Sequence, residues 1–125
     1  QPEPFKYGTD ECHACKMTIM DPKFGCEIIT TKGKLYKFDD AICIARFLTE
    51  NKLAEKDIKQ TLVINFDKQN DFLAVNKAVF VLAQAVKTPM NSHVAAFATK
   101  DAAEKFSADK SGAILNWKEV LLKLQ

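Results

Sequence analysis

The segment CEIITTKGKLYKFDDAICIARFLTEN, residues 26–51, decides the fold because it contains a complete strand–turn–strand–helix unit. Two runs rich in β-branched and aromatic residues predict strands, and Lys32-Gly33-Lys34 predicts the hairpin turn between them. Asp39 or Asp40 can accept hydrogen bonds from the free amides of a following helix, which we place over residues 41–51. The segment therefore predicts an antiparallel hairpin covered by a helix.

The same order of elements recurs later in the chain. Residues 78–82 and 93–98 predict two strands, and Thr99 can cap a helix over residues 100–108. Each unit alone is too small to bury a good core, so we expect one compact α+β domain made of two pseudo-repeated strand–strand–helix units. We divide the chain into an extended tether over 1–10, a first repeat over 11–58, and a second repeat with a terminal helix over 59–125.

Composition excludes several classes of protein. Of the 125 residues, 47% are hydrophobic, which is enough for a core without disulfide staples. The net charge is +2 and the lysines are scattered, so nothing predicts nucleic-acid binding. No run reaches the roughly 18 apolar residues of a membrane-spanning helix. Of the four cysteines, Cys26 and Cys43 lie in apolar patterns, and we interpret them as small buried hydrophobic residues.

Residues 12–20, CHACKMTIM, concentrate soft electron donors. Thiolate and thioether sulfur select soft metals, above all Cu(I). Cys15 and Met17 are two residues apart, so an extended backbone points both sulfur atoms to one side. Met20 follows Ile19 and is predicted to pack in the core, as most methionines do.

A second group of donors lies far along the chain. Met90 and His93 belong to a predicted loop between strands, where functional residues concentrate. A Cys, a Met and a further Met or His make a three-coordinate site that suits Cu(I), so we interpret Met90 and His93 as candidate third ligands beside Cys15 and Met17. Cys12 is a further ligand, a disulfide partner or a spectator.

The Cys-x-x-Cys pair leaves other chemistries open. A structural zinc site needs four ligands, and no second Cys pair or His pair is present. Covalent haem needs histidine where Lys16 stands. Thiol–disulfide exchange stays as the main alternative function, although Asp10 and Glu11 are expected to raise the pKa of the thiols. A structural disulfide between Cys12 and Cys15 is a third possibility.

Three motifs together resemble the NosL family. They are Cys12-x-x-Cys15-x-Met17, the Phe38-Asp39-Asp40 run before a helix, and Thr88-Pro89-Met90, and the resemblance extends from about residue 7 to the terminal helix. One departure is the run Asp40-Ala41-Ile42-Cys43-Ile44, which replaces the family's more common acidic-Cys-Met run.

The resemblance implies a function, a partner and a location. NosL proteins are lipid-anchored periplasmic copper proteins associated with maturation of nitrous oxide reductase. The resemblance therefore implies a non-enzymatic Cu(I) metallochaperone with Cys15, Met17 and Met90 as ligands, and with His93 as a further one. It also implies nitrous oxide reductase or its assembly factors as the acceptor, and membrane attachment through a lipid on a cysteine upstream of Gln1.

Overall fold

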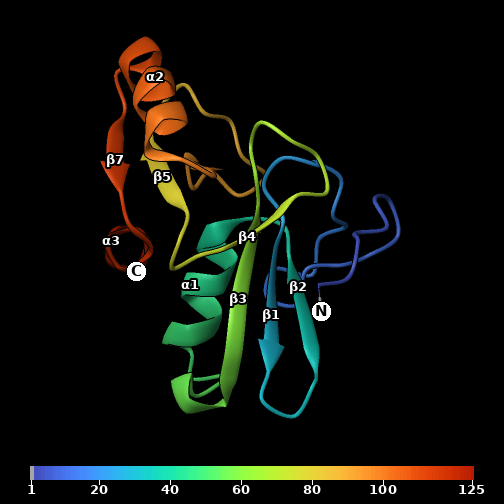
Figure 1. Ribbon diagram of the computed structural model, residues 1–125. Helices are drawn as coiled ribbons and strands as arrows, with labels where there is room; N and C mark the ends of the chain where they lie inside the picture. Colours follow the sequence, from blue (N-terminus) through green and yellow to red (C-terminus); the bar gives the residue numbers. More distant parts are fainter. Residues whose placement is uncertain (1) are drawn as a thin grey trace.

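The computed structural model describes residues 2–125 and confirms an α+β fold with two small antiparallel sheets and three α-helices (Figure 1). In chain order the elements are β1 (Cys26–Thr30), β2 (Leu35–Phe38), α1 (Ala41–Thr49), the 3-10 turn η1 (Glu55–Asp57), β3 (Ile58–Ile64), β4 (Phe72–Ala74), β5 (Val79–Leu82), β6 (Val94–Phe97), α2 (Lys100–Lys110), β7 (Ala113–Leu115) and α3 (Trp117–Leu124). Within residues 2–125, no helix is long and apolar enough to cross a membrane.

The first sheet has the strand order β2-β1-β3-β4, and the second has the order β6-β5-β7. The two hairpin–helix units are therefore β1-β2-α1 and β5-β6-α2. We assigned all of residues 59–125 to the second repeat, whereas β3 and β4 extend the first sheet. β3 pairs with β1 and covers the edge that β1 would otherwise expose, so the first sheet includes strands that follow α1 in the chain.

Helix α1 covers one face of the first sheet. The Phe47 ring on α1 lies 5.2 Å from the Phe38 ring and 5.3 Å from the Tyr36 ring, both on β2. Cys43 and Ile44 are fully buried beside them. The side chain of Asp40 accepts a hydrogen bond from the Ala41 amide at 2.8 Å, so Asp40 is the residue that caps α1.

The N-terminal segment covers the other face of the same sheet. Residues 2–10, which we expected as an extended tether, contain no helix or strand. Phe5 is nevertheless only 6% exposed, and its ring lies 5.9 Å from the Phe72 ring. The amide of Glu3 donates to Glu27 on β1, and the Lys37 amino group on β2 contacts Glu3 and Asp10 at 2.7 Å each. These contacts bring the following turn around the edge of β2 toward α1.

Candidate metal centre

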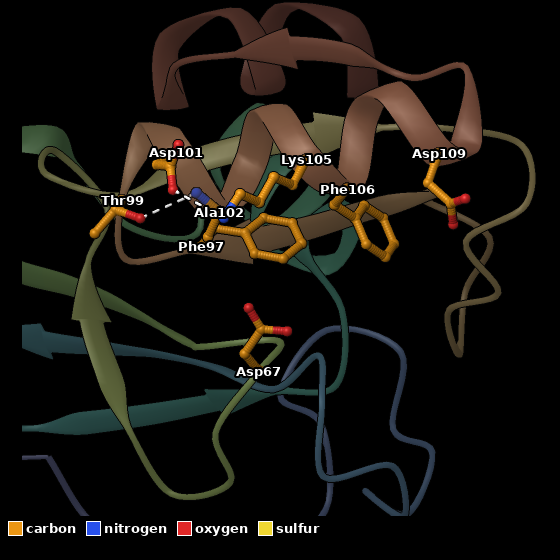
Figure 2. A pocket seen from close by; sticks show the side chains of 8 residues that line it. All are labelled: Asp67, Phe97, Thr99, Asp101, Ala102, Lys105, Phe106 and Asp109. Carbon is orange, nitrogen blue, oxygen red and sulfur yellow. Dashed lines mark hydrogen bonds and ion pairs between the residues drawn. The ribbon is translucent and has the colours of Figure 1, made fainter.

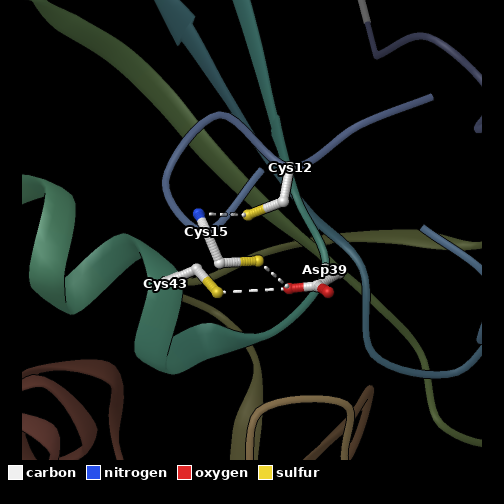
Figure 3. A group of neighbouring side chains, drawn as sticks. All are labelled: Cys12, Cys15, Asp39 and Cys43. Atoms are coloured by element: carbon white, nitrogen blue, oxygen red, sulfur yellow. Dashed lines mark hydrogen bonds between the residues drawn. The ribbon is translucent and has the colours of Figure 1, made fainter. Parts of the chain in front are cut away.

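Four side chains from two segments meet beneath the first turn of α1 (Figure 3). Cys12 and Cys15 come from the N-terminal turn, Asp39 lies directly before the cap of α1, and Cys43 lies in the first turn of that helix. One ligand atom from each of the four lies within 4.8 Å of the other three. We call these four residues the thiol cluster.

The backbone of the turn holds the two N-terminal thiols inward. The amide of Lys16 donates to the Cys12 carbonyl at 3.0 Å, and the Cys12 amide donates to the Met17 carbonyl at 2.9 Å. Lys16 adopts a left-handed conformation with φ +67°, which is uncommon for a residue with a Cβ and closes the turn tightly. The Cys15 amide then points at the Cys12 sulfur, 3.4 Å away.

One oxygen of Asp39 joins the two segments. Its Oδ1 accepts hydrogen bonds from the Cys43 thiol at 3.2 Å and from the Cys15 thiol at 3.5 Å. Asp39, Cys12 and Cys43 are buried, while Cys15 is partly exposed. All four cysteines of the chain are free, so the thiols are available as ligands.

The thiols differ strongly in acidity. The hydrogen bond from Cys43 lowers the pKa of Cys12, which favours the thiolate of Cys12 over those of the other two thiols. Burial raises the pKa of Cys15 to about 11, with the Cys12 and Asp39 charges adding to the effect. The pKa of Cys43 is raised well above its usual value, because its thiol proton is hydrogen-bonded toward Cys12, because it is buried, and because it lies beside Asp39. The expectation that the preceding carboxylates raise the pKa of both N-terminal thiols is therefore wrong for Cys12.

All three methionines of the chain line one pocket beside the thiol cluster. The pocket has a volume of about 340 Å³, and we call it the methionine pocket. Its lining consists of Met17, Thr18, Met20, Asp21, Asp39, Lys87, Thr88, Pro89 and Met90. Asp39 belongs to both the pocket and the thiol cluster, so the thioethers and the thiols are neighbours.

Asp40 fixes the loop that carries Met90. Besides capping α1, its buried carboxylate accepts hydrogen bonds from the Met90 amide at 3.0 Å and the Ser92 amide at 3.3 Å. The Ser92 hydroxyl also donates to Asp40. The two neighbouring aspartates therefore have different roles. Asp40 positions the distant loop, while Asp39 faces the thiols.

The two histidines lie outside both donor sets. His93 is not among the residues that line the methionine pocket, and its Nδ1 lies 2.9 Å from the Val86 carbonyl oxygen. His13, between the two N-terminal cysteines, is turned toward β2. Its Nδ1 accepts from the Lys37 amide at 3.3 Å, and its ring packs edge-on against Tyr36 at 4.8 Å. Burial lowers the pKa of His13 and keeps the ring neutral.

A second pocket, of about 400 Å³, lies beside α2 (Figure 2). Asp67, Asp101, Asp109, Phe97 and Phe106 are among its lining residues, and none of its lining residues carries sulfur. The exposed carboxylate of Asp101 pairs with Lys105 at 3.4 Å. This pocket therefore offers nothing to a soft metal, and the candidate centre is the one beside α1.

Comparison with known proteins places the chain in a family. The family model NosL matches residues 6–124. The chain belongs to the NosL family. No curated protein matches it. The crystal structure of the copper chaperone NosL from Shewanella denitrificans superposes with a TM-score of 0.79, covers 94% of each chain and is 23% identical in sequence. That similarity shows a shared fold.

In this NosL protein, sequence reasoning missed two members of the thiol cluster. We interpreted Cys43 as a small buried hydrophobic residue, and it is buried, but its thiol lies against Asp39. Asp39 was treated only as a possible helix cap. The missed signal was the pair of adjacent aspartates, because one residue caps the helix and leaves the other free. Cys43 lies four residues after Asp39, one helical turn later, which brings the two side chains together.

Met20 also differs from expectation. We predicted that it packs in the core, but its side chain is 65% exposed at the methionine pocket. The neighbouring Ile19 is fully buried and takes the core position instead. The prediction that Met17 and the distant Met90 lie together agrees with the geometry, since both line the same pocket.

Proposed function

We propose that this NosL protein is a Cu(I) metallochaperone. The observation that carries the proposal is the meeting of three thiols and three thioethers at two neighbouring sites that share Asp39. Thiolate and thioether sulfur together match a soft monovalent ion, and thioethers are poor ligands for zinc. Family membership supports the same assignment, and so does the fold shared with a protein described as a copper chaperone.

Within this proposal, Cu(I) is held where the two sites meet. Cys15 is the partly exposed thiol, and it supplies a thiolate once its proton is displaced. Met17 and Met90 complete a three-coordinate site from the pocket side. Cys12, whose pKa is lowered, and Cys43 provide further sulfur for ligand exchange. A three-coordinate ion leaves one direction open for an acceptor's ligand, so copper passes on without being released into solution.

The acceptor and the location are part of the proposal. We infer that copper is delivered for maturation of a periplasmic copper enzyme, nitrous oxide reductase, directly or through its assembly factors. We also infer that the protein acts as a periplasmic lipoprotein held at the membrane. These inferences rest on NosL family membership.

Anaerobic titration with Cu(I) and a competing chelator tests the binding site. The double variant Cys15→Ser with Met90→Ala should bind Cu(I) at least about a hundredfold more weakly. Loss of a residue that only hydrogen-bonds to a metal ligand already lowers metal affinity by up to about a hundredfold, and this variant loses two ligands. Cys26→Ala is the matched control, since Cys26 is a fully buried thiol outside the cluster. If the double variant binds as tightly as the wild type, the proposal is wrong.

Zinc requires a separate test, because three cysteines and an aspartate within 4.8 Å also suit a tetrahedral zinc ion. The double variant Met17→Leu with Met90→Leu removes the thioethers and keeps the thiol cluster intact. It should weaken Cu(I) binding and leave Zn(II) binding unchanged. Equal Cu(I) affinity in this variant and the wild type would favour zinc. X-ray absorption on the copper-loaded protein then counts sulfur ligands directly.

The low pKa of Cys12 favours a second candidate function, thiol–disulfide exchange. A thiolate attacks disulfides once it is accessible, so the turn of residues 12–17 would have to open to expose the buried Cys12, and Cys15 within 4.8 Å can resolve the mixed disulfide. This alternative predicts that Cys15→Ser traps a mixed disulfide with a partner protein. It also predicts that Met17→Leu has no effect, which contrasts with the copper proposal.

A further inference from the structure

Met20 is exposed without a structural reason. Its side chain is 65% exposed, and among residues 2–125 the other large hydrophobic side chains exposed at the surface are Met17, Ile114 and Leu122. Burial of a methionine is favourable, and most methionines pack in cores. Two of the four exposed side chains are thus thioethers, three residues apart, at the same pocket.

The backbone around Met20 is held firmly. Ile19 is fully buried, and its amide donates to the Asp10 carbonyl at 2.8 Å, while its own carbonyl accepts from Gly8 at 3.0 Å. On the other side, Asp21 accepts a hydrogen bond from the Lys23 amide at 3.0 Å. The protein therefore presents Met20 at a fixed place on the rim of the methionine pocket.

The sulfur atoms form a series that runs from solvent to the interior. Met20 is 65% exposed and Met17 is 59% exposed, Met90 and Cys15 are partly buried, and Cys12 is fully buried. Asp39 lines the pocket and contacts the thiols, so the series is continuous in space. An ion that reaches the thiol cluster through this pocket passes exposed thioethers before it reaches the buried Cys12.

We propose that Met20 is a transfer ligand, a thioether that binds Cu(I) at the rim while the ion passes between an acceptor protein and the inner site. The inference rests on the proposed chaperone function and adds a residue outside the Cys15, Met17 and Met90 set. Transfer proceeds by ligand exchange: the bond from copper to Met20 sulfur forms, and then a bond from copper to an inner sulfur breaks. The ion stays monovalent throughout, and a thioether neither takes up nor releases a proton in the exchange.

The first experiment observes the sulfur ligands directly. The chain has three methionines, so a protein labelled with ¹³C at the methionine methyl groups gives three resonances, which single Met→Leu variants assign. Ag(I), a soft monovalent ion that does not change oxidation state here, is the probe. We expect the Met17 and Met90 resonances to shift with the first equivalent of Ag(I), and the Met20 resonance to shift when Ag(I) is added beyond it, because the inner site is then filled. A Met20 resonance that stays in place throughout the excess of Ag(I) overturns the proposal.

The second experiment separates transfer from holding. Met20→Leu keeps the apolar surface and removes the sulfur. We expect its equilibrium Cu(I) affinity to stay within about threefold of wild type, while Cu(I) transfer to a soft chelator slows about tenfold, equivalent to about 1.4 kcal/mol in the barrier. An unchanged transfer rate overturns the proposal, and so does a loss of affinity as large as that of Met17→Leu, which would make Met20 a holding ligand.

Two controls complete the design. If Met20→Leu transfers at the wild-type rate but Met20→Glu is slow, the rim acts as an apolar docking surface and the transfer-ligand proposal fails. Cys15→Ser and Met17→Leu test the chaperone proposal separately, through equilibrium affinity. Normal affinity in those two variants would refute the proposed function, whereas the Met20 result concerns only the route.

Discussion

The sharpest prediction concerns Asp40, because one buried carboxylate caps α1 and holds the loop of Met90. In Asp40→Ala the Ala41 amide loses its cap, which costs about 1 kcal/mol. The Met90 amide loses a charged acceptor, which costs about 2 kcal/mol. The Ser92 amide keeps Thr88 Oγ1 as an acceptor at 2.8 Å, and the Ser92 hydroxyl, which loses Asp40, has the same oxygen at 3.4 Å, so we add nothing for Ser92. The free energy of unfolding should therefore fall by about 3 kcal/mol.

Urea unfolding followed by circular dichroism measures this loss, and we expect a midpoint lower by about 2 M. Thr99→Ala is the matched control, because Thr99 caps α2 through the Ala102 amide at 3.1 Å and holds no distant loop. That variant should lose only about 1 kcal/mol. If Asp40→Ala loses no more stability than Thr99→Ala, then Asp40 does not anchor the loop and this reasoning is refuted. Cu(I) affinity should also fall in Asp40→Ala, since Met90 is no longer positioned.

Three further predictions follow from local contacts. Burial raises the pKa of Glu27 to about 7 from 4.5, so the folded state binds this proton more tightly than the unfolded state. The free energy of unfolding should therefore fall by up to about 3 kcal/mol as pH rises from about 4.5 to about 7. Urea unfolding of Glu27→Gln, compared with wild type at each pH, should lack this pH-dependent loss. Gly25→Ala would place a Cβ 2.7 Å from the Phe5 ring and should cost about 2 kcal/mol, part of which Phe5→Leu in the same chain should restore. Cys43→Ala should reduce the rise in melting temperature on Cu(I) addition, whereas Cys26→Ala should keep it, and equal shifts in the two variants would exclude Cys43 from the site.

Sequence reasoning located the elements well because their signals are local. Turn residues, caps and hydrophobic patterns place α1, β5, β6 and α2 close to their observed bounds. The partner of a strand is not a local property, and for that reason β3 was assigned to the wrong half of the chain although its pattern is plainly that of a strand.

For the candidate metal site too, only the residues with local sequence signals were predicted. Cys12, Cys15 and Met17 were identified from their spacing, and Met90 from its place in a loop. Cys43 was missed because a cysteine in an apolar helix has the pattern of a core residue, and only the tertiary structure brings it to Asp39. The burial of the N-terminal segment was equally invisible, since a proline-rich polar start gives no sign of the groove that Phe5 fills.

The donors come from three stretches of chain: the N-terminal turn, the start of α1 and the loop before β6. In an unfolded chain these stretches are far apart, and closing loops of that length costs entropy before any metal bond can form. An unfolded molecule therefore keeps together only the donors of residues 12–20, without Cys43 and Met90 beside them. Because the full set of donors exists only in the folded state, metal binding and folding are thermodynamically linked, and unfolding would weaken the binding of a metal ion at this site.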